Sequence, residues 1–282
     1  MLLAHAARRL AEAGVESPRV DAELLLGHVL GLSRAGLITL DDVSGDDAAR
    51  FDALVAQRAD RVPLQHLTGR APFRYLELAV GPGVFVPRPE TEQLAGWAVE
   101  QLGGTPAPVV VDLGSGSGAL ALSIAHEHPG ARVTAVERDA GAIEWTRHNA
   151  TARATAGDSP VEVLAGDMTD PRLLRELDGL VDLIVSNPPY VPDGARVPRE
   201  VADHDPPLAL WGGPDGLDVV RGLLVTAARL LKPGGWLGIE HADQQGGSMP
   251  ALVRAHGRFT DVEDHPDLAG RPRFTTARRV GG

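Results

Sequence analysis

Apolar residues recur at helical spacing through the first quarter of the chain. One apolar stripe runs from Leu3 to Ala13, and Ser17-Pro18 then offers an N-cap followed by a proline suited to a first helical turn. The same spacing continues over Asp21 to Leu30 and from Asp46 to Arg58. The pattern therefore predicts a small helical bundle over residues 1–68. Both a structural cap and a docking domain for a protein partner are consistent with such a bundle.

The pattern changes after residue 68. Apolar side chains such as Phe73, Leu78 and Val84 now lie among glycines and prolines, which predicts a β-hairpin over residues 69–92 that links two domains. This stretch ends in Pro87-Arg88-Pro89-Glu90-Thr91-Glu92, whose prolines favour an extended entry into a helix over 93–102. We expect Arg88, Pro89, Glu90 and Thr91 to form a rim over a ligand pocket. The alternative is a plain helix start whose acidic residues favour the helix dipole.

From residue 109 onward, apolar runs alternate with helical patterns. Strands are predicted at 109–111, 132–136, 161–164, 181–186 and 236–240, and helices at 119–126, 140–150 and 217–231. This alternation is typical of a mostly parallel sheet with helices on both faces. The tail over 251–280 adds a predicted helix and two antiparallel strands. The fold class is therefore α/β.

Composition narrows the function classes. The 282 residues carry a formal net charge of −11 and no cysteine. An acidic chain is a poor generic binder of nucleic acid, so we expect no stable nucleic-acid partner. No apolar run approaches the length of a membrane span, and no signal peptide is apparent, so we expect no membrane association. Together with the missing cysteines, this favours a cytoplasmic protein without disulfides or thiolate metal sites.

The stretch Asn187-Pro188-Pro189-Tyr190 follows the predicted strand over 181–186. Because neither proline has an N–H for the ladder, the chain must leave the sheet there, at the carboxyl edge where open α/β sheets bind ligands. The Asn187 side-chain oxygen and the Pro188 carbonyl can accept both hydrogens of a planar –NH2 group while Tyr190 covers its face. The nitrogen then points at an electrophile. The alternative is an ordinary turn that closes a strand.

A glycine-rich turn follows the first strand of the alternating region. Gly114 to Gly118 let the backbone approach a ligand closely, and Glu137 ends the next strand, where it can accept from ribose hydroxyls. Both features also fit a nicotinamide dinucleotide enzyme. However, Asp112 places a negative charge where a pyrophosphate would lie and is suited to a cationic amino-acid group. Asp167 is placed to accept from an adenine amino group. The alternative for each of these acids is a helix cap or a turn residue. These residues together are suited to a ribose, an adenine and a cationic amino-acid group. S-adenosylmethionine, a nucleoside that carries an amino acid, contains all three groups.

These motifs resemble those of the class I methyltransferases and, within them, the peptide-chain release factor glutamine methyltransferases. The resemblance covers essentially the whole chain. It rests on Pro87 to Glu92, Asp112 to Gly118, Asn187 to Tyr190, Leu208-Ala209-Leu210 with Gly212 to Asp218, and Leu231 to Gly235. It implies a Rossmann-like, mostly parallel sheet, joined by the β-hairpin to the N-terminal helical domain. The domains are then 1–68 for substrate docking, 69–92 as linker and pocket rim, and 93–282 for catalysis.

The resemblance also implies roles for individual residues. Glu137 is expected to hold the ribose, Met168 to lie against the adenine, and Asn187 to bridge cofactor and substrate. Asn187, Pro188, Pro189 and Tyr190 are expected to cradle the substrate glutamine, presented on a Gly-Gly-Gln loop of a class 1 release factor. The residues expected to line the cofactor are Asp112, Gly114, Ser115, Gly116, Ser117, Gly118, Glu137, Asp167, Met168 and Asn187. The chain departs from the family pattern at Met168, at Asp205-Pro206-Pro207 and at His241-Ala242-Asp243, which we expect to tune packing or docking.

The expected reaction is a single in-line transfer of a methyl group to an amide nitrogen, with S-adenosylhomocysteine as the product and no metal. Positioning and carbonyl dipoles supply most of the acceleration. The nearest rival is a methyltransferase of exocyclic amines, such as N6 of adenine, in DNA or RNA. A non-catalytic cofactor-binding scaffold and, more remotely, a nicotinamide dehydrogenase are further alternatives. The acidic net charge weighs against a methyltransferase of DNA or RNA, and the intact stretch from Asn187 to Tyr190 weighs against a non-catalytic scaffold.

Overall fold

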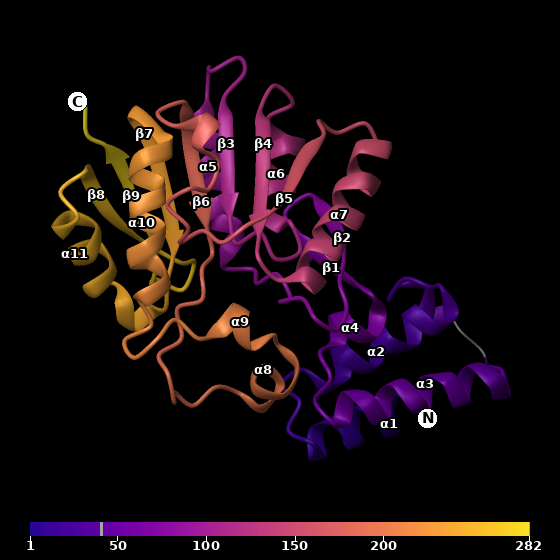
Figure 1. Cartoon of the computed structure of the whole chain (residues 1–282). Helices are drawn as coiled ribbons and strands as arrows, with labels where there is room; N and C mark the ends of the chain where they lie inside the picture. The colour runs from indigo at the N-terminus through magenta and orange to yellow at the C-terminus, as the bar shows by residue number, and fades with distance from the viewer. Residues whose placement is uncertain (40–41, 282) are drawn as a thin grey trace. The chain divides into compact units, whose positions relative to one another are not determined.

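A computed structural model describes residues 1–39 and 42–281. The chain divides into two compact units (Figure 1). The helical unit comprises Met1–Arg70, Val80–Pro82 and Val197–Asp205, and the sheet unit comprises Ala71–Ala79, Gly83–Arg196 and Pro206–Gly282. The chain therefore leaves the sheet unit shortly after Tyr190, enters the helical unit, and returns.

The helical unit is a bundle, as the apolar spacing predicts. Its elements are α1 (Leu2–Glu12), α2 (Pro18–Leu30), the 3₁₀ turn η1 (Gly36–Thr39), α3 (Gly45–Ala59), α4 (Leu64–Thr68) and α8 (Arg199–His204). Leu10, Leu25 and Phe51 form its fully buried centre. The Ser44 hydroxyl accepts from the Asp47 amide at the start of α3, which satisfies one of the free N–H groups of that helix end.

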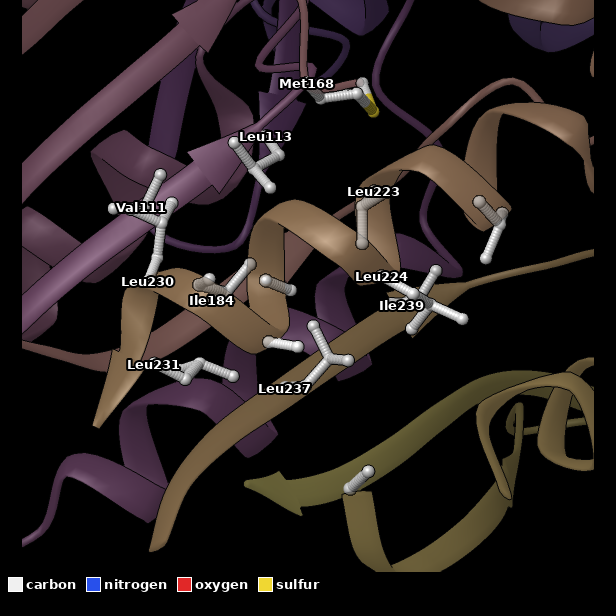
Figure 2. Close-up of a cluster of buried hydrophobic side chains, with 14 of the residues drawn as sticks. Val111, Leu113, Met168, Ile184, Leu223, Leu224, Leu230, Leu231, Leu237 and Ile239 are labelled. Carbon is white, nitrogen blue, oxygen red and sulfur yellow. The ribbon is translucent and has the colours of Figure 1, made fainter. Parts of the chain in front are cut away.

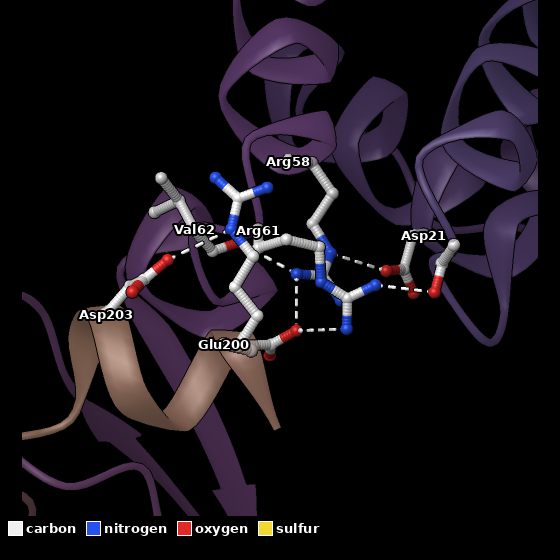
Figure 3. Close-up of polar contacts among 8 residues, drawn as sticks. Asp21, Arg58, Arg61, Val62, Glu200 and Asp203 are labelled. Carbon is white, nitrogen blue, oxygen red and sulfur yellow. Dashed lines mark hydrogen bonds and ion pairs between the residues drawn. The ribbon is translucent and has the colours of Figure 1, made fainter. Parts of the chain in front are cut away.

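Helix α8 is held in the helical unit by a buried ion-pair cluster (Figure 3). The Arg58 guanidinium donates to Asp21 over 2.7 Å, to Glu200 on α8 over 2.8 Å, and to the Val62 carbonyl over 2.9 Å. Arg61 lies 3.5 Å from the same Glu200 carboxylate. The Arg58 side chain is only 8% exposed. Removing Asp21 or Glu200 would therefore leave the buried positive charge of Arg58 only partly compensated.

The sheet unit contains a seven-stranded sheet in the order β5-β4-β3-β6-β7-β9-β8. Its strands are β3 (Val109–Leu113), β4 (Arg132–Glu137), β5 (Val161–Ala165), β6 (Val181–Ser186), β7 (Leu231–Glu240), β8 (Phe259–Pro266) and β9 (Pro272–Arg279). The first five are parallel, while β9 is antiparallel to both β7 and β8. These findings confirm the predicted α/β class and the antiparallel tail. The chain between Val181 and Leu183 shifts register against β7, where Lys232 to Gly235 bulge out.

Helices cover both faces of the sheet. The helices of the sheet unit are α5 (Thr91–Leu102), α6 (Ala119–Glu127), α7 (Ala140–Thr155), α9 (Pro207–Leu210), α10 (Asp218–Leu230) and α11 (Ser248–Ala255), with 3₁₀ turns η2 (Arg175–Leu177) and η3 (Asp243–Gln245). Alternate residues of one strand point to opposite faces, so Val110 packs towards α5 and α6 while Val111 packs towards α10. Figure 2 shows the buried cluster on the α10 side, in which Leu224 lies beside Ile239. Each such buried side chain contributes about 1.5–3 kcal/mol.

The predicted hairpin is present but shorter than expected. It consists of β1 (Arg70–Phe73) and β2 (Leu76–Ala79), whereas Val84, Phe85 and Val86 lie outside any strand. Prolines at 82, 87 and 89 supply no N–H for a ladder, and Val84 and Val86 are buried by packing instead. Helix α5 also begins two residues earlier than predicted, at Thr91. None of the helices in the described part of the chain has the length and apolar character needed to cross a membrane.

Candidate active site

The polar residues singled out in the sequence follow neighbouring parallel strands at one edge of the sheet. Register pairs Leu113 with Val136 and Glu137 with Ala165, and Ser186 with Ile239, so the carboxyl ends of β3 to β7 lie level. The Ser186 hydroxyl also donates to the Leu113 carbonyl, which ties the end of β6 to the end of β3. The glycine turn and Asn187 therefore leave the same edge side by side.

The glycine turn folds back over the end of β4. The amides of Gly114 and Ser115 donate to the Val136 carbonyl over 2.8 and 3.0 Å. Gly114 and Gly116 have φ of +83° and +57°, which side chains rarely adopt. A Cβ on Gly114 would lie 2.6 Å from the Met168 methyl group, whereas one on Gly116 would meet open space. The turn thus has a packed side at Gly114 and an open side at Gly116.

The two serines of the turn point into the protein. Ser115 is buried with its hydroxyl 3.4 Å from the Thr146 hydroxyl, and the Ser117 carbonyl accepts from the Asn149 amide. Their predicted contribution to cofactor binding would therefore come from the backbone. Gly118 has φ of +87° and ends the turn directly before α6.

Glu137 lies against the glycine turn. Its carboxylate accepts from the Gly116 amide over 2.9 Å and from the amides of Arg138 and Asp139 over 2.7 and 2.9 Å. The residue as a whole is partly exposed. A carboxylate held by three backbone donors at this place is a preset acceptor for hydroxyl groups.

Asp112 is fully buried beneath the turn. Its Oδ2 atom accepts from the Ala121 amide over 3.1 Å, and Oδ1 has no hydrogen-bond partner among the described residues. Burial raises the pKa of Asp112 to about 7, and the Ala121 bond offsets only part of this effect. A buried carboxyl with an unmatched oxygen is suited to a cation close to the turn.

Asp167 and Met168 follow β5. The Asp167 carboxylate accepts from the amide and hydroxyl of Thr169 over 2.8 and 2.7 Å and lies 3.4 Å from the Arg138 guanidinium. Burial acts to raise the pKa of Asp167, but the Thr169 bonds and Arg138 outweigh it and lower the pKa. Met168 is buried with its methyl group against Gly114. These two side chains thus border the glycine turn on the β5 side.

The side-chain oxygen of Asn187 and the carbonyl of Pro188 accept no hydrogen bond from the described residues. The Asn187 Nδ2 atom donates to the Thr91 hydroxyl over 3.2 Å. Pro188 and Pro189 are buried, and Tyr190 is half-buried. Burial is also the main reason why the pKa of Tyr190 rises, so its hydroxyl stays protonated.

A second glycine-rich loop, over residues 212–216, packs closely against the backbone of Pro189 and Tyr190. A Cβ on Gly212 would lie 2.6 Å from the Pro189 carbonyl oxygen, and one on Gly216 would lie 2.1 Å from the Tyr190 carbonyl oxygen. Gln245 Nε2 donates to that same Tyr190 carbonyl over 3.1 Å. Only the absence of side chains at Gly212 and Gly216 lets the two backbones approach so closely.

Glu240 ends β7 next to Asn187 and was not among the predicted site residues. It is 1% exposed, and the side chains of Thr91 and Asn187 lie beside it. Burial raises its pKa to about 7, although hydrogen bonding by these two side chains and the charge of Arg273 act in the opposite direction. Neither Glu240 nor Gln245 has a local signal in the sequence, because an acid at a strand end and a glutamine in a loop are common.

The predicted rim residues Arg88, Glu90 and Thr91 have different surroundings in the structure. Thr91 is buried under Asn187, and Arg88 stacks over the Phe85 ring at 4.8 Å. Glu90 lies 3.8 Å from the Arg271 guanidinium. His241 is fully buried and bonds to Asp264 and to the Ala242 carbonyl, so it belongs to the packing of the sheet. Of the four rim candidates, Thr91 contacts the Asn187 side chain directly.

Comparison with known proteins gives consistent relatives along the whole chain. Residues 1–69 match the family model described as PrmC N-terminal domain, and residues 78–203 match the model described as Methyltransferase small domain. The chain is 54% identical to the release factor glutamine methyltransferase of Mycolicibacterium smegmatis, over 96% of this chain and 94% of that protein. It is 51% identical to the protein of the same name from Streptomyces coelicolor, over 99% of this chain and 97% of that protein.

Solved structures show the same fold at low identity. The 16S rRNA N2 G1207 methyltransferase of T. thermophilus, in complex with AdoMet and guanosine, has a TM-score of 0.52 and 24% identity, and covers 74% of this chain and 49% of that one. The hMettl16 catalytic domain has a TM-score of 0.55 and 14% identity, and covers 84% of this chain and 82% of that one. Both likenesses concern the fold alone.

Proposed function

The chain belongs to the release factor glutamine methyltransferases, and on that premise we propose that it methylates the side-chain amide nitrogen, N5, of the glutamine in the Gly-Gly-Gln motif of class 1 peptide-chain release factors. S-adenosylmethionine is the proposed methyl donor. The observation that carries this proposal is the pair of free acceptors, Asn187 Oδ1 and the Pro188 carbonyl, at the carboxyl edge next to the glycine turn. A primary amide has the two N–H groups that match them.

The residues at the edge fit the proposed cofactor. The open side of Gly116 leaves room for a ligand against the backbone, and the preset Glu137 carboxylate is suited to ribose hydroxyls. The unmatched Oδ1 atom of Asp112 is suited to the cationic amino group of the methionine part. Asp167 and Met168 border the place proposed for the adenine. When bound, S-adenosylmethionine supplies an electrophilic methyl group on a sulfonium sulfur and leaves as S-adenosylhomocysteine.

The chain's own residues then prepare the nucleophile. Asn187 Oδ1 and the Pro188 carbonyl accept the two N–H bonds of the glutamine amide, which raises electron density on a nitrogen whose lone pair is otherwise delocalised. Tyr190 packs on the amide plane and restricts its rotation. The two acceptor dipoles also stabilise the positive charge that develops on nitrogen during transfer. The surplus proton of the methylated amide passes to water, so no general base is required.

The helical unit is the proposed docking domain for the release factor. It carries α8, which lies between Tyr190 and the supporting loop at Gly212 in the sequence. A release factor that binds α8 would therefore contact the segment that connects Tyr190 to the supporting loop at Gly212. The net charge of −11 supports a protein partner over nucleic acid.

Mass spectrometry of a release factor after incubation with this protein and S-adenosylmethionine tests the proposal. The expected product carries one added methyl group on the Gly-Gly-Gln glutamine. A release factor with Gln replaced by Glu in that motif is the matched control and should gain none. If the native factor stays unmodified while the protein binds S-adenosylmethionine, the proposal is wrong, and DNA or RNA amines become the substrates to test.

A further inference from the structure

The Asn187 amide works as proposed only in one of its two orientations. The oxygen must face the substrate, because an NH2 group turned there would meet the substrate's N–H groups as a second donor. A free Asn side chain can rotate its amide by half a turn at little cost, since that torsion is broad. Something in the chain must therefore determine which atom faces the pocket.

Two contacts on the inner side of Asn187 determine the orientation. Nδ2 donates to the Thr91 hydroxyl over 3.2 Å, and the Glu240 carboxylate, whose pKa the Asn187 side chain lowers, lies beside this amide. The Thr91 hydroxyl has a single hydrogen, and the Glu240 carboxylate, whose pKa this hydroxyl lowers, is the acidic acceptor beside it. The Thr91 oxygen is then available to Asn187 only as an acceptor. Above its pKa of about 7, Glu240 is ionised and likewise acceptor-only, so both neighbours then require N–H groups from Asn187.

The surroundings of Glu240 keep its carboxylate in place. It is 1% exposed, and Oε2 has no hydrogen-bond partner among the described residues. The cationic Arg273 acts on it from β9, while Glu90 and the Tyr190 ring complete the charged and titratable groups that face it. A buried carboxylate is costly, and the polar side chains of Thr91 and Asn187 offset part of this cost. A purely structural position would be better served by an apolar side chain.

We propose that Glu240 and Thr91 are positioning residues that together hold both N–H groups of Asn187, so that Oδ1 faces the amide nitrogen to be methylated. This inference rests on the proposed function and deepens it. Neither residue touches the reacting atoms. Their effect passes through Asn187, and their removal leaves the amide free to turn its NH2 group towards the substrate.

Paired substitutions separate positioning from packing. Glu240→Gln keeps an acceptor oxygen, whereas Glu240→Met fills the same space without one. Thr91→Ser keeps the hydroxyl, whereas Thr91→Val keeps the shape. If the residues position Asn187, kcat falls about tenfold or more in Glu240→Met and Thr91→Val, because a hydrogen bond to a charged group is lost. Glu240→Gln and Thr91→Ser should restore most of the rate. If the residues only pack, the order within each pair reverses, and that result would overturn the proposal.

Two further measurements complete the test. Thr226, a fully buried threonine of α10 whose hydroxyl has no partner among the described residues, gives the matched control Thr226→Val, which should keep the wild-type kcat. The dissociation constant for S-adenosylmethionine should stay within about twofold in all variants, since the glycine turn is untouched. A thermal melt of each variant shows whether it remains folded.

A readout that needs no activity keeps this inference apart from the proposed function. In ¹⁵N-labelled protein, the side-chain NH2 signals of Asn187 are assigned by their loss in Asn187→Asp. Glu240→Met and Thr91→Val should shift or broaden them, while Thr226→Val should not. Unchanged signals would refute the positioning role even if release factors are methylated. Shifted signals in a protein that methylates no release factor would refute the proposed substrate and leave the positioning role standing.

Discussion

A Cβ atom on Gly216 would lie 2.1 Å from the carbonyl oxygen of Tyr190. Gly216 also has φ of +74°, so a substitution meets both backbone strain and a clash. Gly216→Ala should therefore displace Tyr190 or destabilise the sheet unit by about 3 kcal/mol or more, the sum of the left-handed strain and the overpacking. Urea unfolding together with the rate of methyl transfer measures both effects.

Gly257 supplies the control for this substitution. Its φ of +73° is almost the same, but a Cβ there would meet nothing within 4 Å. Gly257→Ala should cost only the backbone strain, about 1 kcal/mol, and leave the rate unchanged. Equal losses of stability and rate in the two variants would show that the approach of Gly216 to Tyr190 has no effect of its own.

Asn187→Ala should lower kcat by a factor of about 10²–10³, comparable with the loss of one preorganised polar group at a transition state. The binding of S-adenosylmethionine by the glycine turn should change little in comparison. Single-turnover rates and calorimetric titration of the cofactor separate the two quantities. Methyl transfer near the wild-type rate in this variant would remove the amide cradle from the mechanism.

Arg58→Met should destabilise the protein strongly, because it leaves the buried Asp21 without its cation and leaves Glu200 with Arg61 at 3.5 Å. Breaking such a pair from one side costs about 3–5 kcal/mol. Arg9→Met is the matched control. Its partner Asp52 has a side chain that is 65% exposed, so the loss should stay below about 1 kcal/mol. Chemical denaturation of both variants gives the comparison, and a small loss for Arg58→Met would mean that α8 is held mainly by other contacts.

Asp112→Asn should stabilise the cofactor-free protein, and more so at high pH. The folded-state pKa of Asp112 is raised to about 7, so the stability linked to its proton is present at acidic pH and is lost as the pH rises through 7. An asparagine cannot ionise, and its oxygen can still accept from Ala121. We expect a gain on the order of 3 kcal/mol at pH 8.5 and a much smaller one at pH 5, together with weaker binding of S-adenosylmethionine.

Asp267→Asn should behave in the opposite way. Backbone and side-chain bonds from Arg271 hold the pKa of Asp267 at about 2, so its stabilisation is present above the ordinary carboxyl pKa and is lost only as the pH falls through 2. The variant should be less stable than the wild type by the same amount at pH 5 and pH 8.5. Denaturant midpoints of both variants at the two pH values test the pair of predictions.

The sequence predicted the parts of the fold that depend on local pattern. The apolar runs at 109–111 and 181–186 became central strands, and the two prolines after Asn187 ended β6 as expected. Helix α8 was not predicted, because its six residues carry no amphipathic repeat and its main ion-pair partner, Arg58, lies 142 residues away. Glu240 and Gln245 were missed for a similar reason. Their significance comes from groups that only the folded chain brings close.

The placement of α8 also bears on how the protein is made. Arg58 and Asp21 are synthesised early, but the second carboxylate of the cluster, Glu200, follows only after β3 to β6 have been translated. Domains generally fold as units during synthesis, N-terminal first. Here the first unit must wait on the ribosome for a helix encoded after Asn187 before its buried arginine is fully compensated. A nascent chain released after Arg58 but before Glu200 has been translated would therefore carry an incomplete helical unit.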